Sequence, residues 1–112
     1  MKEIEEIVLN STEEAEKVLF IFHGYGADNE NMRPLGEVFA SVFPKMEIHI
    51  PNAPEDCEEN SGRQWFSLKE NDMEIWRQSC SEKIPEIMEY ITGVLEKKKL
   101  SPKEAVVAGF SQ

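Results

Sequence analysis

The apolar residues of the chain first predict a strand followed by a helix. Residues 18–22 form an unbroken apolar run, which is typical of a strand buried on both faces of a parallel sheet. Between Met32 and Phe43 the apolar residues recur at steps of three and four, which predicts an amphipathic helix. We expect Asn31 to cap this helix and Pro44 to end it.

A second strand and a longer helix follow in the same order. Residues 46–50 alternate between apolar and polar side chains and predict a short strand. The polar segment that begins at Pro51 predicts a long loop, and loops of such length usually carry function. Asn71 and Glu74 resemble a capping box at the start of a second helix, and we expect Pro85 to kink it. The apolar face of this helix contains Cys80, Ile84, Ile87, Ile91 and Leu95.

The remaining apolar runs complete a regular alternation of strands and helices. Residues 105–108 predict a third buried strand, and the apolar residues between Ile4 and Leu9 indicate an N-terminal strand. Such alternation indicates a parallel sheet with helices on both faces. We therefore expect residues 1–112 to be part of a single three-layer α/β domain.

Composition and charge narrow the possible functions. The 112 residues are 40% hydrophobic, as in globular proteins, and carry a formal net charge of −10. This charge would repel both nucleic acid and an anionic membrane. No apolar run approaches the roughly 18 residues of a membrane span, and the acidic first residues do not resemble a secretory signal. We expect a cytoplasmic protein without an integral membrane segment.

Neither the cysteines nor the acidic residues predict a metal site. Cys57 and Cys80 form no Cys-x-x-Cys motif, so neither a zinc site nor a disulfide framework is indicated. The acidic cluster lacks the regular spacing and the turn glycine of a calcium loop, and we expect it to be a solvated loop. The cluster contains Glu55, Asp56, Glu58 and Glu59.

Candidate chemistry lies after two of the predicted strands. Open α/β sheets place their active sites at the carboxyl ends of the strands. After the third strand, residues 109–112 supply the first four positions of the G-x-S-x-G nucleophile elbow, with Ser111 as the serine. After the first strand, residues 23–26 lie where this fold builds one side of an oxyanion hole. Ser111 is therefore the candidate nucleophile.

Four short motifs in order resemble one known family. They are Phe-His-Gly-Tyr-Gly-Ala-Asp (residues 22–28), Pro-Asn-Ala-Pro (51–54), Gly-Arg-Gln-Trp-Phe (62–66) and Ala-Gly-Phe-Ser-Gln (108–112). The series is similar to that of the phospholipase/carboxylesterase family of α/β-hydrolases, which includes the acyl-protein thioesterases. The resemblance implies a Ser-Asp-His hydrolase that cleaves carboxylic esters or thioesters, including lysophospholipids and S-acylated proteins in some members. It implies no cofactor, because acyl transfer through a serine needs none.

The resemblance also implies a role for individual residues. Ser111 would be the nucleophile, and the backbone N–H groups of Tyr25 and Gln112 would form the oxyanion hole. Trp65 and Phe66 would border the acyl-binding site, although simple packing of this pair against the sheet is an equal alternative. The residues that would shape the oxyanion loop are His23, Gly24, Gly26 and Asp28.

Neither histidine is expected to be the general base. This fold supplies its catalytic partners in the order Ser, Asp, His, so a histidine that precedes the serine is out of order. We expect His23 to shape the oxyanion loop and His49 to be a partly buried polar residue. Asp28 should hold its loop through hydrogen bonds to nearby N–H groups.

The motif series stops at the serine, which predicts an incomplete enzyme. No residue after Ser111 can supply the acid or the base of the triad, so we expect residues 1–112 to be an inactive N-terminal half of a longer hydrolase. Ser111 and Gln112 are expected to form a loose end. The strand before them should be an open sheet edge that invites self-association.

Two other functions compete with the esterase hypothesis. A non-catalytic interaction module could self-associate through the open sheet edge. A phosphate or dinucleotide binder could use Gly24 and Gly26, but the loop lacks the third glycine and the phosphate-binding lysine of such sites. Within the esterase hypothesis, acyl chain length and leaving group depend on pocket depth and lid loops that the motifs do not define.

Overall fold

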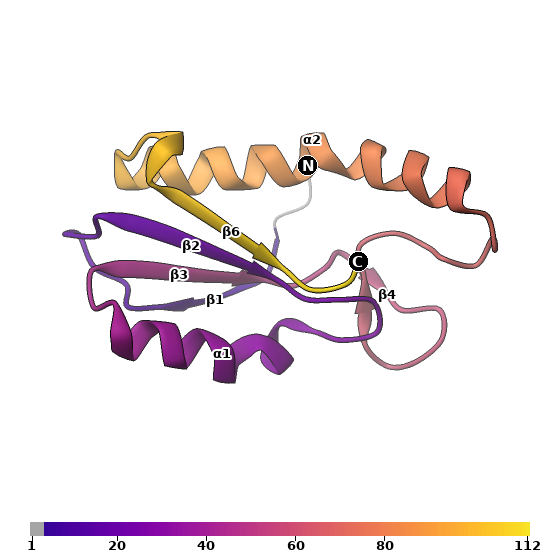
Figure 1. The fold of residues 1–112 in the computed structure, drawn as a ribbon, viewed down its shortest axis with the longest axis horizontal. Helices are drawn as coiled ribbons and strands as arrows, with labels where there is room; N and C mark the ends of the chain where they lie inside the picture. The colour runs from indigo at the N-terminus through magenta and orange to yellow at the C-terminus, as the bar shows by residue number, and fades with distance from the viewer. Residues whose placement is uncertain (1–3) are drawn as a thin grey trace.

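A single sheet forms the middle layer of the molecule. The computed structural model describes residues 4–112, in which a four-stranded sheet has the order β1-β3-β2-β6 (Figure 1). Its strands are β1 (Glu6–Leu9), β2 (Lys17–Phe22), β3 (Met46–Pro51) and β6 (Ala105–Gly109). Strand β2 is parallel to both of its neighbours, whereas β1 runs antiparallel to β3. The predicted N-terminal strand is present, and its direction makes the sheet mixed.

Two helices cover opposite faces of this sheet. Helix α1 (Asn29–Val42) lies on one face and α2 (Met73–Lys98) on the other (Figure 1). A short 3-10 turn, η1 (Pro102–Glu104), leads into β6, and β4 (Glu55–Asp56) pairs with β5 (Arg63–Gln64) in a separate ladder. Within residues 4–112 neither helix combines the length and the apolarity that a membrane span requires. The predicted three-layer α/β fold is confirmed.

The two faces of the sheet give two apolar cores. The core beneath α2 contains Val18, Phe20, Ile91 and Leu95. The core on the α1 side contains Leu19, Ile21, Ile48 and Ile50. Successive residues of β2 enter opposite cores because strand side chains alternate between faces, which explains its unbroken apolar sequence. On the predicted apolar face of α2, Ile84 is 50% exposed, whereas Ile91 and Leu95 are buried. Only the C-terminal half of that face is therefore buried against the sheet.

Both helices begin at an aspartate instead of the predicted asparagine. Asp28 caps α1: its Oδ1 atom accepts the N–H of Asn31 at 3.0 Å, while Oδ1 of Asn31 accepts the N–H of Asp28 at 2.9 Å. Asp72, and not Asn71, caps α2 by accepting N–H groups of the first turn. Each cap satisfies N–H groups that have no partner inside the helix.

Strand β6 is an edge of the described sheet. Among the described strands it pairs only with β2, and its Val106 and Val107 side chains are 43% and 58% exposed. The predicted open edge is therefore present, but the expectation that residues 105–108 are buried is wrong. An apolar run shows that a strand can be buried, whereas actual burial depends on whether another element covers it.

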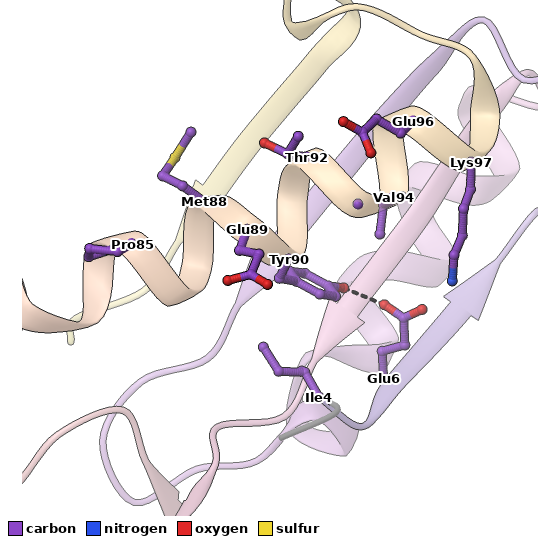
Figure 2. Close-up of a pocket in the computed structure, with 11 residues that line it drawn as sticks. Ile4, Glu6, Pro85, Met88, Glu89, Tyr90, Thr92, Val94, Glu96 and Lys97 are labelled. Atoms are coloured by element: carbon purple, nitrogen blue, oxygen red, sulfur yellow. Dashed lines mark hydrogen bonds between the residues drawn. The ribbon is translucent and has the colours of Figure 1, made fainter. Parts of the chain in front are cut away.

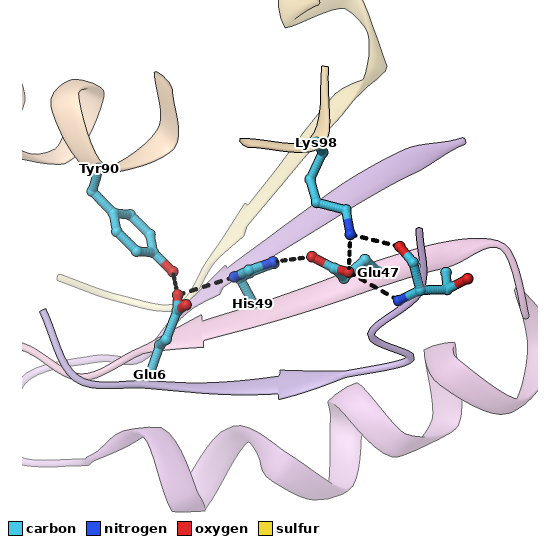
Figure 3. A network of polar contacts seen from close by, with 6 residues as sticks. Glu6, Glu47, His49, Tyr90 and Lys98 are labelled. Atoms are coloured by element: carbon cyan, nitrogen blue, oxygen red, sulfur yellow. Dashed lines mark hydrogen bonds and ion pairs between the residues drawn. The ribbon is translucent and has the colours of Figure 1, made fainter. Parts of the chain in front are cut away.

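Polar residues of β3 form a buried network beneath α2 (Figure 3). The Nδ1 atom of His49 lies 3.0 Å from Oε2 of Glu6, and its Nε2 atom lies 2.6 Å from Oε2 of Glu47. The Nζ atom of Lys98 lies 2.8 Å from Oε1 of Glu47, and the Tyr90 hydroxyl donates to Glu6. Only 7% of the His49 side chain and 3% of the Glu47 side chain are exposed. His49 is thus more deeply buried than predicted, and the network joins β1, β3 and α2.

The partners in this network keep the charged forms in spite of burial. Burial lowers the pKa of His49, but the hydrogen bonds to Glu6 and Glu47 outweigh it and raise the pKa above the ordinary 6.5. Burial raises the pKa of Glu47, but Lys98 and His49 outweigh it and lower the pKa below the ordinary 4.5. For Glu6, burial is likewise outweighed by His49 and Tyr90, so its pKa is also lowered.

These shifts define the pH range in which the network stabilises the fold. The contribution of His49 is complete below its unfolded pKa and is lost as pH rises through its folded pKa. The contributions of Glu6 and Glu47 are complete above their unfolded pKa and are lost as pH falls through their folded pKa. Stabilisation is therefore greatest between the ordinary values of 4.5 and 6.5.

We expect Glu47→Gln to lower the free energy of unfolding by about 3 kcal/mol, because it leaves Lys98 and His49 without their buried carboxylate. Denaturant unfolding at about pH 5.5 measures this loss in the complete gene product, the polypeptide encoded up to the natural stop codon. The matched control is Glu16→Gln, which removes an ion pair with Lys45 whose side chains are 69% and 66% exposed and should cost below about 1 kcal/mol. Equal losses in the two variants would contradict the role of the network.

Candidate active site

Ser111 occupies a strained turn directly after β6. Its φ of 57° lies in the left-handed region that residues with a side chain rarely adopt, and the residue is exposed. The N–H of Phe110 donates to the carbonyl of Phe22 at 3.1 Å, so hydrogen bonding between β6 and β2 continues up to the turn. This geometry matches a nucleophile elbow, which presents the serine hydroxyl above the end of a strand.

The loop after β2 packs closely against this turn. Gly24 is buried, and a methyl group on its Cα would lie 3.0 Å from the carbonyl oxygen of Phe110 and 3.3 Å from Cβ of Ser111. A side chain at this position would therefore force the Phe110 backbone to move by a few tenths of an ångström. Among residues 4–112 no backbone carbonyl accepts the N–H of Tyr25 or that of Gln112. Both N–H groups are thus candidate donors to an external acceptor.

His23 is fully buried, and both of its ring nitrogens are occupied. Its Nε2 atom accepts the N–H of Ala53 at 3.0 Å, so Nδ1 carries the proton and donates to the carbonyl of Gly24 at 2.8 Å. Burial lowers the pKa of His23 below the ordinary value of 6.5, which keeps the ring neutral. No nitrogen is left to accept the proton of Ser111, and the imidazole instead holds the backbone of the loop.

Trp65 packs against β2 and also borders a cavity. Its indole N–H donates to the carbonyl of His23 at 2.8 Å, and its ring centroid lies 5.4 Å from that of Phe22. A cavity of about 370 Å³ lies between Trp65, the half-buried Phe66 and Ser111. Its other walls come from α2 and β6 and include Cys80, Ile84, Ile87 and Val107. The two sequence-based alternatives for Trp65, packing and cavity wall, are therefore compatible.

The prediction that Ser111 and Gln112 form a loose end is wrong. The Gln112 side chain is hydrogen-bonded to the backbone of both Trp65 and Phe66. These bonds join the elbow to a loop more than 40 residues earlier in the chain. The contact pattern could not be read from the sequence, because a glutamine in a motif does not identify its distant partner.

A larger cavity lies elsewhere, between α2 and β1 (Figure 2). Its volume is about 690 Å³, and its walls include Ile4, Glu6, Tyr90, Val94 and Lys97. No residue predicted for the active site borders this cavity. Size alone therefore does not identify the site, and the smaller cavity beside Ser111 is the one that contains the candidate nucleophile.

Residues 60–64 bond to the loop after β2, and the sequence pattern did not reveal these contacts. The N–H of Gly26 donates to the carbonyl of Arg63 at 2.9 Å, and the N–H of Arg63 donates to the carbonyl of Ala27 at 2.8 Å. The Nδ2 atom of Asn60 donates to the carbonyl of Gly26 at 3.2 Å. Gly26 itself has a φ of 81°, which favours glycine. The glycines of the two motifs were the available signal, because close backbone approach requires them.

Glu58 is a second residue whose role the sequence did not reveal. Its carboxylate accepts the Tyr25 hydroxyl at 2.6 Å, the N–H of Leu68 at 2.8 Å and the Ser67 hydroxyl. In the same loop, Asp56 forms an ion pair with Arg63. Asp56, Glu58 and Glu59 are exposed, as expected for a solvated loop, but Glu58 and Asp56 also bind neighbouring segments. Carboxylates in a polar loop show no periodicity, so the sequence could not indicate these bonds.

Comparison with known proteins adds independent evidence. The sequence profile of the family described as Phospholipase/Carboxylesterase matches residues 3–112. The chain belongs to the phospholipase/carboxylesterase family. The resemblance inferred from the four motifs is thereby confirmed.

The chain is also similar to two proteins that are named as esterases. Esterase YpfH of Escherichia coli (strain K12) is 32% identical over 69 residues, which cover 62% of this chain and 30% of YpfH. The crystal structure of esterase PE8 has a TM-score of 0.89 at 24% identity, over 99% of this chain and 54% of PE8. The second comparison establishes the α/β-hydrolase fold. The chain spans about half of the length of PE8 and less than a third of that of YpfH.

We expect Gly62→Ala to destabilise this family member, because a methyl group at Gly62 would lie 2.1 Å from the carbonyl oxygen of Gly26. No side-chain rotation relieves a clash between backbone and Cβ, so the loss should be about 2 kcal/mol. The matched control is Gly93→Ala in α2, where the methyl group meets no atom within 4 Å and alanine favours the helix by up to about 1 kcal/mol. Thermal unfolding of the complete gene product measures both. Equal melting temperatures would contradict the close approach of the two loops.

Proposed function

We propose that this protein is a serine hydrolase of carboxylic esters or acyl thioesters. The Oγ atom of Ser111 attacks the acyl carbonyl, and the alcohol or thiol leaves to give an acyl-enzyme, which water then hydrolyses to the free acid. One structural observation supports this proposal most strongly. The exposed, left-handed Ser111 packs directly against the loop that contains the candidate oxyanion donor of Tyr25.

The oxyanion hole would consist of two backbone N–H groups, those of Tyr25 and Gln112. Each would donate to the oxygen that becomes negative when Ser111 attacks, a form of stabilisation that is strongest for preorganised donors. The tight contact of Gly24 with the elbow supports this assignment. So does the lack of a backbone acceptor for either N–H group within residues 4–112.

The acyl chain would occupy the cavity beside Ser111. Its volume of about 370 Å³ lies in the range of small-ligand sites, and its aromatic and aliphatic walls suit an apolar chain. Trp65 and Phe66 form the wall nearest the elbow. The substrate class is therefore a small-molecule or lipid ester or thioester, with lysophospholipids and S-acyl groups as the candidates that the family resemblance implies.

The general base would come from outside residues 1–112. Those residues contain two histidines, and both are buried with both ring nitrogens engaged: His23 by Ala53 and Gly24, and His49 by two glutamates. A serine without a base keeps its high pKa and is a poor nucleophile. Residues 1–112 alone would therefore be inactive, with the triad Asp and His supplied by another part of the protein.

A second candidate function rests on the exposed edge strand. Val106 and Val107 of β6 are uncovered in the described part of the chain, and an open apolar edge favours pairing between copies. In that case the protein would be a non-catalytic module that self-associates. A complete gene product that is folded and dimeric, yet neither hydrolyses esters nor reacts with a serine probe, would favour this function over the esterase.

We expect Ser111→Ala to abolish labelling by a fluorophosphonate probe and to reduce p-nitrophenyl ester hydrolysis by at least about 10³-fold in the complete gene product. The matched control is Ser41→Ala, since Ser41 is an exposed residue of α1 whose hydroxyl donates to the carbonyl of Val38 in the same helix. This control should label and hydrolyse like the unmodified protein. The isolated 112-residue chain should do neither. Undiminished labelling of Ser111→Ala would refute Ser111 as the nucleophile.

A further inference from the structure

The side chain of Gln112 pairs with a short stretch of backbone in the aromatic loop. Its Oε1 atom accepts the N–H of Trp65 at 2.9 Å, and its Nε2 atom donates to the carbonyl of Phe66 at 2.8 Å. A carboxamide presents a donor and an acceptor side by side, so it can bind backbone much as a neighbouring strand does. Both ends of the Gln112 carboxamide are thus satisfied by a single loop.

Hydrogen bonds continue from this loop to the other side of the site. The indole N–H of Trp65 donates to the carbonyl of His23 at 2.8 Å. The Nδ1–H of His23 then donates to the carbonyl of Gly24 at 2.8 Å, and its Nε2 accepts the N–H of Ala53 at 3.0 Å. A series of hydrogen bonds therefore connects the elbow to the loop after β2 by way of Gln112, Trp65 and His23.

This series ends on the peptide group that carries one of the candidate oxyanion donors. The carbonyl of Gly24 and the N–H of Tyr25 belong to the same planar, trans peptide, in which they point in opposite directions. The Gly24 carbonyl accepts the Nδ1–H of His23 at 2.8 Å and the N–H of Ala27 at 3.2 Å, so His23 helps to fix the direction of this carbonyl and, with it, that of the Tyr25 N–H. The other candidate donor is the backbone N–H of Gln112, whose own side chain is the first link of the series.

We propose that the Gln112 carboxamide is a positioning group that locks the nucleophile elbow to the aromatic loop and so sets the relative placement of the two oxyanion donors. This inference rests on the proposed esterase function and assigns the Gln112 side chain a task separate from that of its backbone N–H. Both polar atoms of the carboxamide bond to the backbone of the aromatic loop and not to the Ser111 hydroxyl, although Gln112 also lines the cavity beside Ser111. The carboxamide acts through Trp65 and His23, and its removal leaves both N–H groups present but less well aligned.

The expected effect lies on the chemical step. An oxyanion exists only in the tetrahedral transition state and intermediate, so misaligned donors lower kcat while substrate binding is largely retained. Displacement of reacting groups by about 1 Å can cost about 10²-fold in rate. A thionoester should suffer less than the matching oxoester, because sulfur accepts hydrogen bonds weakly and gains less from the donors.

Gln112→Glu in the complete gene product tests this inference, since glutamate has the same shape but cannot donate to the Phe66 carbonyl. We expect kcat for a p-nitrophenyl ester to fall about 10- to 100-fold, KM to change less than about threefold, and the thionoester to lose less. Gln78→Glu is the matched control, because Gln78 is exposed on α2, and it should retain full kcat. Gln112→Met, which makes neither bond, should reproduce the loss and replaces Gln112→Glu if that variant does not fold.

Two results separate this inference from the proposed function. If the unmodified protein hydrolyses the ester through Ser111, but Gln112→Glu and Gln112→Met keep the kcat of the Gln78 variant, the positioning role is overturned and the esterase function stands. Equal losses for oxoester and thionoester would also overturn it, because a general loss of structure affects both alike. If Ser111→Ala leaves hydrolysis intact, the proposed function itself fails.

Discussion

The buried imidazole of His23 is the contact on which the loops around Ser111 depend. One nitrogen receives the N–H of Ala53, the other donates to the carbonyl of Gly24, and its own carbonyl receives the indole of Trp65. Burial keeps the ring neutral by lowering its pKa, and only the neutral ring can donate at one nitrogen while accepting at the other. A charged ring would lose the bond to Ala53. The histidine nearest the serine is therefore a loop anchor by virtue of its protonation state.

The sheet that supports these loops is stabilised differently on its two faces. Beneath α1 the sheet packs through a core of apolar side chains, whereas beneath α2 it combines an apolar core with the charged network of Glu6, His49, Glu47 and Lys98. Such buried charges are tolerated because every one of them has a partner. The network fixes α2 on the sheet, and α2 in turn provides a wall of the cavity beside Ser111.

The sequence predicted the helices and strands of this fold better than their burial and their long-range side-chain contacts. Periodicity identified β2, β3 and both helices, because their apolar residues repeat with the spacing of the structure itself. The apolar run of β6 by itself predicted a buried strand, and only the motif series indicated the open edge at which Val106 and Val107 are exposed. The motifs located Ser111 and the loop of Gly24, but not Glu58, Asn60 or the partners of the Gln112 side chain. Those contacts join residues between 9 and 47 positions apart in polar segments that carry no periodic signal.

We propose that Ser111 stands at a preorganised oxyanion hole built by two distant loops. A crystal structure of the complete gene product after reaction with a p-nitrophenyl phosphonate tests it most directly, because the phosphonyl oxygen imitates the oxyanion. We expect phosphorus bonded to Oγ of Ser111 and the phosphonyl oxygen about 2.7–3.1 Å from the N–H nitrogens of both Tyr25 and Gln112. A phosphonyl oxygen held by other groups, or an imidazole of His23 turned toward Ser111, would contradict it.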